Sequence, residues 1–195
     1  MANLGAESKT DFYANFDGSN GNLIFELPNN RWLGLADPHA QGRTAGYWKS
    51  EYQTNPEWRR VDVDTAYDSQ SKELGNYLGD FWYRLEFNLP AAAKTLEAKL
   101  HIGPVDDESW VWLNGEFLGE VTKKTHPKNY WEFPRSYPLE AGKLRPGRNV
   151  LVILCRNLAG SGGIFGIPAL TFRKKFNFYT DTPQSSDNPY QYYRW

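Results

Sequence analysis

The sequence has a single cysteine, no excess of positive charge and no long hydrophobic run. Cys155 is the one cysteine in 195 residues, which excludes a disulfide within the chain and a metal cluster held by several thiolates. Lysine and arginine number 22 against 23 acidic residues, so there is no surplus of positive charge to neutralise phosphates, and nucleic acid is not an expected partner. No apolar run reaches the length that spans a bilayer, so no membrane partner is expected either.

Aromatic residues are abundant instead, at 16 % of the chain, with eight tryptophans and twelve tyrosines. Short alternating apolar runs, separated by glycine and proline, predict an all-β fold of the sandwich or jelly-roll type. The predicted domain covers residues 1–175, and residues 176–195 form a C-terminal tail of different composition. Two segments between strands, 38–56 and 65–78, are long enough for a helical turn. The predicted strands are residues 23–27, 31–35, 58–63, 81–89, 96–102, 109–113, 117–121, 130–133, 149–156 and 167–173.

If consecutive strands run antiparallel, four polar loops gather at one end of the sandwich. They are residues 71–80, 104–108, 122–129 and 157–163. Sugar binding needs aromatic faces for the C–H groups of the ring and planar polar side chains for paired hydroxyls, and these loops offer both. The candidate ligand-binding residues are Asn76, Tyr77, Asp80, Asp107, His126, Asn129, Tyr130, Arg156 and Asn157.

Catalytic chemistry has little support. Asp106, Asp107 and Glu108 are consecutive in a short loop, which rarely gives the separation that a glycosidase acid and base require. We expect one carboxylate to bond loop amides or Arg84 and another to face water. The sequence AGSGG resembles the serine elbow of hydrolases, but Ala159 stands where the first glycine belongs.

Metal binding is suggested at one place only. The segment FDGSNGN is rich in oxygen donors, although it does not have EF-hand spacing. A structural calcium ion, held by Asp17, Asn20 and Asn22, is one interpretation, and a plain turn is the other. The three histidines form no metal-binding motif, and no cofactor is otherwise required.

Three stretches carry a family resemblance: GDFWYRLEFNLP, HIGPVDDESWVWLNGEFLGE and LRPGRNVLVILCRNLAGSGGIFG. Together they resemble the galactose-binding-like β-jelly-roll domain, which is the sugar-binding domain of family 2 glycoside hydrolases and recurs in related carbohydrate-binding modules. The likeness extends over roughly residues 30–173. The loop TKKTHPKN and the C-terminal tail lie outside it, and no catalytic barrel follows.

The strand at 109–113 is apolar on both faces, with Trp110 and Trp112 on one and Val111 and Leu113 on the other. The resemblance implies that a bulky residue beside the Asn114-Gly115 turn supports the fold. We therefore expect another segment of the chain to cover the two tryptophans, since large bare apolar patches are rare on domains without a partner.

The sequence and the resemblance together predict a non-catalytic carbohydrate-binding module associated with bacterial polysaccharide degradation. Its expected partners are an oligosaccharide or polysaccharide and the catalytic domain of a glycoside hydrolase. A structural accessory domain without its own ligand is the first alternative, and a free-standing esterase or lyase is the second. We expect a secreted or periplasmic location, with the sequence as a mature or excised piece because MANLGAESKTD lacks a signal-peptide core; a cytoplasmic location stays open.

Overall fold

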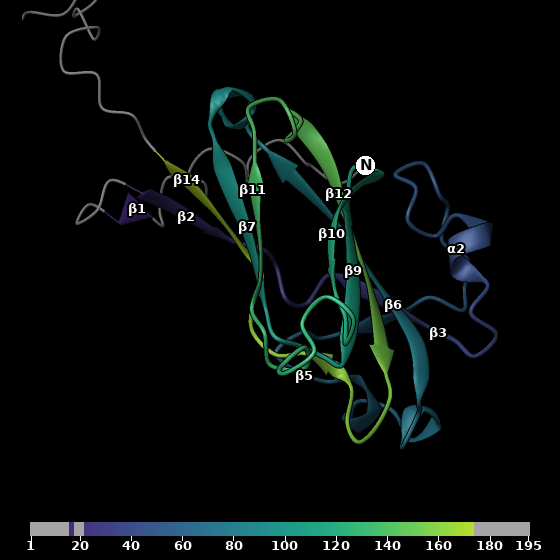
Figure 1. Cartoon of the computed structure of the whole chain (residues 1–195). Coiled ribbons are helices and arrows are strands. Elements are labelled where there is room, and N and C mark those ends of the chain that lie inside the picture. Colours follow the sequence, from purple (N-terminus) through teal and green to yellow (C-terminus); the bar gives the residue numbers. More distant parts are fainter. Residues whose placement is uncertain (1–15, 18–21, 174–195) are drawn as a thin grey trace, which may run out of the picture.

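The structure, a computed structural model, describes residues 16–17 and 22–173. Two antiparallel sheets face each other as a β-sandwich, and a small third sheet lies at one end (Figure 1). The all-β sandwich predicted from the sequence is confirmed. No helix within the described ranges is long and apolar enough to cross a membrane.

The strands divide among three sheets. In spatial order, the five-stranded sheet holds β1 (Phe16–Asp17), β2 (Asn22–Glu26), β14 (Ala169–Arg173), β7 (Ala98–Gly103) and β11 (Arg135–Leu139). The six-stranded sheet holds β10 (Glu116–Val121), β9 (Glu108–Leu113), β12 (Gly147–Asn157), β6 (Gly79–Leu89), β3 (Trp32–Asp37) and β4 (Arg59–Val61). The three-stranded sheet holds β5 (Thr65–Ala66), β13 (Gly163–Ile164) and β8 (Val105–Asp106).

Helical structure is limited to short turns. The segments expected to hold a turn do so, with α2 (Gly42–Ala45) in the first and the 3₁₀ turns η1 (Tyr67–Ser69) and η2 (Lys72–Leu74) in the second. A further 3₁₀ turn, η3 (Ala91–Thr95), connects β6 to β7 and lies outside the two segments expected to hold a helical turn.

One predicted strand is wrong. Residues 130–133 form turns, because the carbonyl oxygen of Asn129 accepts hydrogen bonds from the backbone N–H groups of Glu132 and Phe133, and the strand β11 begins only at Arg135. The aromatic run YWEF has the composition of a strand, and composition alone cannot show that the backbone turns there. The sequence also misses four two-residue strands, β1, β5, β8 and β13, which are too short to show an alternating pattern.

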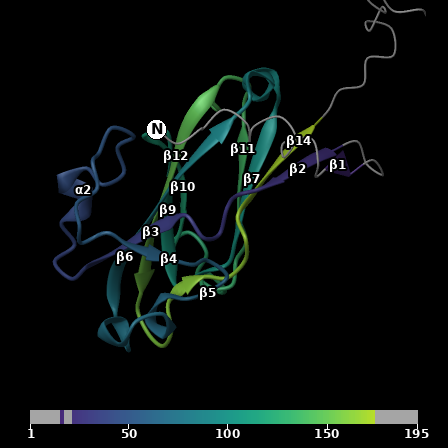
Figure 2. The ribbon, with the colours of Figure 1, turned by 180° about the vertical axis from the view of Figure 1, so that it is seen from behind.

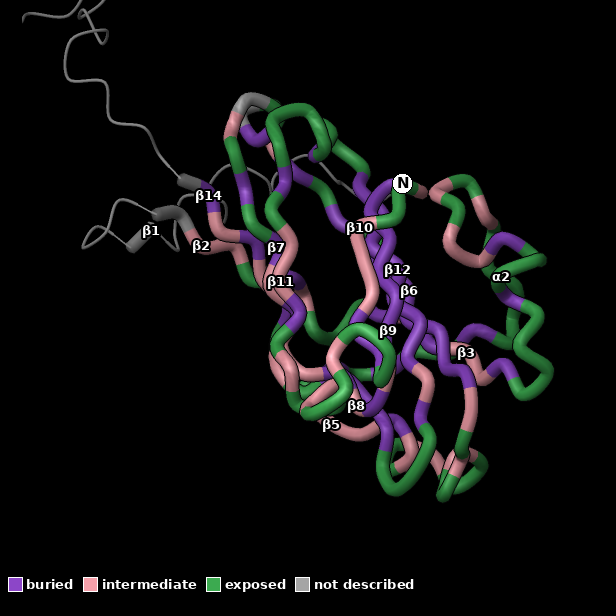
Figure 3. The backbone as a smooth tube through the Cα atoms, in the orientation of Figure 1, coloured by how far each residue is buried: buried purple, intermediate pink, exposed green. Residues whose placement is uncertain are grey.

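The main core fills the space between the two large sheets. Residues at alternate positions of the central strands point into it, among them Phe81, Leu85, Leu151 and Ile153, each 0 or 1 % exposed. Tyr67 stacks flat on Phe81 with ring centroids 4.2 Å apart. Strands β6 and β12 are buried over most of their length (Figure 3), because they are covered on both faces.

A second apolar cluster lies on the outer face of the six-stranded sheet. It contains Trp58, Trp82, Trp110, Trp112, Val150, Val152 and Leu154. Residues 38–58, which we call the strap and which include α2, supply Tyr47, Trp48 and Tyr52 against this cluster. Trp48 stacks on Trp112 at 6.4 Å. Trp110 and Trp112 are only 8 % and 7 % exposed, so the prediction that another segment covers them is confirmed.

Two buried polar side chains on the sheet hold the strap in place. The guanidinium of Arg84 donates to four strap carbonyl oxygens: those of Lys49, Ser50 and Tyr52 at 3.0–3.1 Å and that of Tyr47 at 3.4 Å. The carboxylate of Asp37 accepts from the backbone N–H groups of Gln41 and Gly42 at the start of α2, and from the indole of Trp82. A side chain at position 42 would collide with that indole, at 2.4 Å from Nε1, so only glycine fits.

Candidate functional site

Strand register confirms that the predicted loops share one end of the sandwich. Asn157 at the end of β12 pairs with Gly79 at the start of β6, and Arg156 pairs with Glu108 at the start of β9. Val121 at the end of β10 pairs with Ser109. We call this region, at the bottom of Figure 1, the loop end; it comprises residues 71–80, 104–108, 122–134 and 157–168.

Two of the candidate binding residues pair with each other. Arg156 donates from Nε and Nη2 to the two carboxylate oxygens of Asp80, at 2.6 and 2.9 Å. Asp80 is 4 % exposed, and its hydrogen bonds raise the pKa of Arg156. The guanidinium also lies 5.1 Å from the centre of the Trp110 ring. This bidentate pair joins β6 to β12 and leaves its oxygens little capacity for a ligand.

Asp107 and Asn157 support the loop that follows β12. The carboxylate of Asp107 accepts from the backbone N–H groups of Leu158 and Ala159 at 2.7 and 3.2 Å. The Asn157 amide, 1 % exposed, donates to the carbonyl oxygens of Tyr77 and Gly160. The expected hydrogen bond between a loop carboxylate and backbone amides is therefore present, whereas Arg84 donates to carbonyls of the strap instead.

Tyr77 is held in the same framework. Its hydroxyl donates to the carbonyl oxygen of Asp80 at 2.9 Å, and its ring contacts Tyr67 edge to face at 6.0 Å. Burial raises the pKa of Tyr77 to about 12. Of the predicted site residues, Tyr77, Asp80, Asp107, Arg156 and Asn157 thus make contacts that stabilise the loops themselves.

Asp106, at the loop end, has a pKa far above the ordinary value of an aspartate. Burial, a side-chain hydrogen bond with Asp107 and the charge of that neighbour together raise the pKa of Asp106 to about 7, against a smaller opposing effect of Arg135. Arg135 is 1 % exposed and donates to the Asp107 carbonyl oxygen at 2.8 Å and to Ser109 Oγ at 2.9 Å. The two neighbouring carboxyl groups therefore contact each other.

The loop of residues 122–134 has a different character. The side chains of Thr122 and Thr125 hydrogen-bond across its base, and His126 packs on Phe133 with ring centroids 4.1 Å apart. Tyr130 and Trp131 meet edge to face at 5.2 Å, and Trp131 is 42 % exposed. Burial, followed by the negative charges of Asp107, Glu108 and Asp106, raises the pKa of Tyr130.

Three of the remaining predicted residues, His126, Asn129 and Tyr130, belong to this loop, and Asn76 lies on the exposed turn before β6. Asn76 has a positive φ of 61°, which asparagine tolerates better than most residues. The sequence prediction did not include Trp131, although Tyr130 in the same predicted strand was a candidate. Its place directly after Tyr130 in a polar stretch was the available signal.

Exposed apolar side chains also gather at the loop end. Among the described residues, large hydrophobic side chains at least 38 % exposed are Leu78, Phe117, Trp131, Leu158, Phe165 and Ile167. All except Phe117 lie at the loop end: Phe165, for example, donates its N–H to the carbonyl oxygen of Pro104. The sequence prediction did not anticipate this concentration.

The predicted calcium site includes residues of β1 and β2, and Asp17 pairs with Asn22 across these two strands. Asn20 lies outside the described residues, and the calcium site stays a prediction. In the part of the chain that the structure describes, no three His, Cys, Asp or Glu side chains are grouped to hold a metal ion.

With the geometry established, comparisons with known proteins define the class. A family model described as "Beta-galactosidase second all-beta domain" matches residues 43–161, more than half of the chain. The chain belongs to this family, which is an accessory all-β domain of glycoside hydrolases, and the resemblance inferred from the sequence is confirmed. A search of curated proteins found no significant match.

Solved structures show the same fold within larger enzymes. A Ruminococcus gnavus β-glucuronidase matches with a TM-score of 0.65 at 18 % identity, over 80 % of this chain and 28 % of that one. An uncultured Clostridium sp. β-glucuronidase matches with a TM-score of 0.66 at 18 % identity, over 82 % of this chain and 30 % of that one. The chain therefore spans less than a third of the length of these enzymes.

Proposed function

We propose that this chain is a non-catalytic accessory domain of a glycoside hydrolase and binds carbohydrate at its loop end, chiefly through residues 122–134. The observation that carries the proposal is the Tyr130–Trp131 pair, which presents exposed aromatic surface on a loop beside the carboxylates of residues 106–108. A polysaccharide ligand fits a secreted or periplasmic location.

The chemistry of this loop suits a sugar. An exposed indole offers a flat apolar face to the C–H groups of a pyranose ring. Beside it stand polar groups with free capacity: the Asn129 side chain makes no hydrogen bond within the described part of the chain, and Glu132 is exposed. Unlike the Asp80–Arg156 pair, these groups can meet a hydroxyl without giving up an existing partner.

The arrangement of the carboxyl groups supports a non-catalytic role. The paired carboxyls of a retaining glycosidase stand about 5 Å apart, and those of an inverting enzyme stand further apart. Asp106 and Asp107 instead share a hydrogen bond, and Asp80 is held by Arg156. Glu108 accepts from the backbone N–H of Lys123. Each of these carboxyls is already engaged by a neighbouring group, which supports a non-catalytic role.

A structural accessory role is the second candidate, and the apolar side chains of the loop end favour it. Leu78, Leu158, Phe165 and Ile167 would be buried if this end packed against another domain of the enzyme. The two roles use overlapping surface, but they differ in the effect of Trp131. A sugar site needs its aromatic face, whereas a docking surface would share the interaction among all the apolar residues.

The test is a titration of the purified chain with the best glycan from an array screen. Trp131→Ala should reduce affinity by about 1–3 kcal/mol, if a sugar stacks on the indole as bases do on aromatic platforms. Trp131→Phe should keep part of the affinity, and the melting temperature should hardly change. Phe117→Ala, which removes an exposed aromatic ring outside the loop end, is the matched control.

Failure of the proposal would have a definite form. If no glycan binds, while Leu158→Ser and Phe165→Ser weaken association with a catalytic domain, then the structural accessory role is correct. If a glycan binds and the Trp131→Ala variant matches the unmodified chain, the site lies elsewhere.

A further inference from the structure

An open cavity of about 810 Å³ lies beside β3 at the edge of the six-stranded sheet, and we call it the strap groove. The strap lines one side of it, and residues 70, 71, 73 and 74 of the segment that contains η1 and η2 line another. Figure 2 shows β3 and β4 from behind, with α2 of the strap to their left. Because β4 and β10 are the two edge strands of this sheet, the strap groove lies at the opposite edge from residues 122–134, which follow β10.

The strap groove forms where β4 leaves part of β3 without a neighbour. β4 pairs with Trp32–Gly34 only, whereas β6 pairs with β3 as far as Asp37. The Asp37 carbonyl oxygen accepts from the N–H of Ala40 in the turn that follows. Leu35 and Ala36 line the groove and have no partner strand on that side among the described strands. An uncovered strand edge presents backbone N–H and C=O groups, which a ligand can meet.

Polar side chains beside this edge have hydrogen-bonding capacity to spare. Those of His39 and Gln41 are exposed, line the groove and make no hydrogen bond within the described part of the chain. The Glu57 carboxylate is also exposed, and among the described residues it accepts one hydrogen bond, from Asn55 at 3.2 Å. A carboxylate accepts from several donors at once, and a primary amide both donates and accepts. The groove therefore offers donors and acceptors of both kinds.

The charges that line the strap groove cancel. Asp37 is occupied by the start of α2 and by a buried indole. Arg59 and Glu73 form an ion pair with each other at 2.9 Å. Glu57 and Arg60 are left without an ion pair among the described residues, and they carry opposite charges. The lining therefore favours a neutral ligand over an anion or a cation.

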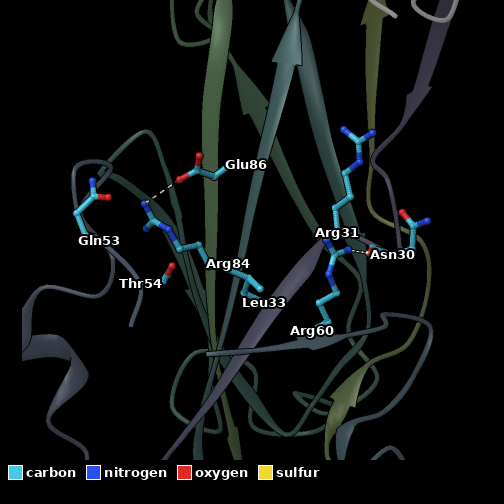
Figure 4. A pocket seen from close by; sticks show the side chains of 8 residues that line it. All are labelled: Asn30, Arg31, Leu33, Gln53, Thr54, Arg60, Arg84 and Glu86. Atoms are coloured by element: carbon cyan, nitrogen blue, oxygen red, sulfur yellow. Dashed lines mark hydrogen bonds and ion pairs between the residues drawn. The ribbon is translucent and has the colours of Figure 1, made fainter. Parts of the chain in front are cut away.

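A smaller pocket of about 520 Å³ adjoins the groove through Arg60 (Figure 4). There, Arg60 donates to the carbonyl oxygen of Asn30 at 3.0 Å. Arg84 donates to the strap and lies 3.5 Å from Glu86. These charged groups are engaged by the chain itself, so we assign a ligand to the strap groove alone.

We propose that the strap groove binds a neutral oligosaccharide, as a second glycan site separate from residues 122–134. Hydroxyl groups both donate and accept, which matches an open backbone edge flanked by an amide, an imidazole and a carboxylate. Leu35, Pro38 and Leu74 add apolar surface for the C–H groups of a sugar ring. The cavity volume also falls within the range of about 300–1,000 Å³ that is usual for small-molecule sites.

The choice of a sugar rests on the same family membership as the proposed function, but the site does not use the same loop. An extended peptide that adds a strand to the sheet is a less suitable occupant. Leu35 and Ala36 are only two open residues, and an ordinary strand has about five or six.

The experiment follows the backbone amide signals of the isotope-labelled chain by NMR during titration with three neutral tetrasaccharides: a galactotetraose, a cellotetraose and a mannotetraose. At least one of them should shift the signals of residues 35–41 and 57–61. A strand-forming peptide of alternating valine and threonine should leave these signals in place. The proposal is overturned if no tetrasaccharide shifts them, or if only the peptide does.

Matched variants within the strap locate the binding. Glu57→Ala should weaken it about tenfold and Gln41→Ala about threefold, as expected for the loss of hydrogen bonds to a charged and to a neutral group. Glu51→Ala and Gln53→Ala remove the same groups from exposed strap positions outside the groove, and should leave the affinity unchanged. All four side chains are exposed, so the melting temperatures should hardly differ. If Glu57→Ala and Glu51→Ala weaken binding equally, the proposal is wrong.

Trp131→Ala separates this site from the loop end. It should abolish any sugar-induced shift in residues 122–134 and leave the shifts in residues 35–41 and 57–61 intact. Shifts confined to residues 122–134 would overturn the strap groove and leave the proposed function standing. Shifts confined to the groove would do the reverse.

Discussion

Under the strap, Trp110 and Trp112 are 8 % and 7 % exposed, whereas Trp131 at the loop end is 42 % exposed. The covered pair lies in the regular strand β9, where alternation places both tryptophans on the same face of the sheet. The strap packs on that face and excludes water from it. Trp131 lies in a turn and touches mainly Tyr130. The difference teaches that a tryptophan-rich sequence does not identify its own binding surface. The cover supplied by a distant segment decides which rings remain available.

The largest expected effect is the loss of stability when a covered tryptophan ring is removed. Trp112→Ala should lower the free energy of unfolding by about 3–5 kcal/mol, because it leaves a cavity between Trp48, Trp82 and the sheet. Phe117→Ala, at a ring 54 % exposed and 5.5 Å from Trp112, should cost far less. Denaturant titration measures both. A fully stable Trp112→Ala variant that loses only sugar binding would reverse the roles of the two regions.

The next effect concerns the attachment of the strap. Arg84→Met keeps most of the side-chain volume but removes the donors to four strap carbonyls, and should cost about 2–3 kcal/mol, as expected for buried hydrogen bonds to a charged group. Hydrogen exchange should accelerate in residues 38–58 and stay unchanged at the loop end.

Arg59→Met is the matched control, since its exposed ion pair with Glu73 should contribute less than about 1 kcal/mol. If exchange accelerates equally at both places, the strap is not a separately held element, and the comparison between the two regions fails.

Most of the architecture could be predicted from the sequence, because alternation in strands such as β6 and β12 records which face is buried. Antiparallel neighbours reverse direction at each turn, so the order of the strands also predicts that the loops lie at one end. The two-residue strands could not be found, because their pairing depends on segments far away in the chain: Gly163 pairs with both Ala66 and Asp106.

The candidate site was harder to predict, because side-chain type does not show which hydrogen bonds are already made. Asp80 and Arg156 have the composition of sugar ligands, yet each satisfies the other. Trp131 was not among the candidates, although Tyr130 in the same predicted strand was.

The smallest expected effect is the pH dependence of stability, which should come from the loop end. The tryptophans under the strap have no titratable group and should contribute nothing to it. The pKa of Asp106 rises from its ordinary value of 3.8 to about 7 in the folded chain. A group with a raised pKa binds a proton on folding, so its contribution is complete below about pH 4 and is lost as the pH rises through about 7. The full shift corresponds to about 4 kcal/mol, but Asp106 is only half-buried and solvent screens it, so we expect about 1–2 kcal/mol.

Thermal unfolding between pH 5 and pH 8 measures this effect. The melting temperature of the unmodified chain should fall as the pH rises, because ionised Asp106 is then held in a partly desolvated position and faces the charge of Asp107, which Arg135 only partly offsets. Asp106→Asn keeps a neutral side chain that can still donate to Asp107, so its melting temperature should be less sensitive to pH and higher than that of the unmodified chain at pH 8. Glu132→Gln, which neutralises an exposed carboxylate of the same region, should keep the original slope. If Asp106→Asn and Glu132→Gln give the same profile, then the carboxyl pair is not the source, and the loop end is electrostatically as inert as the covered face.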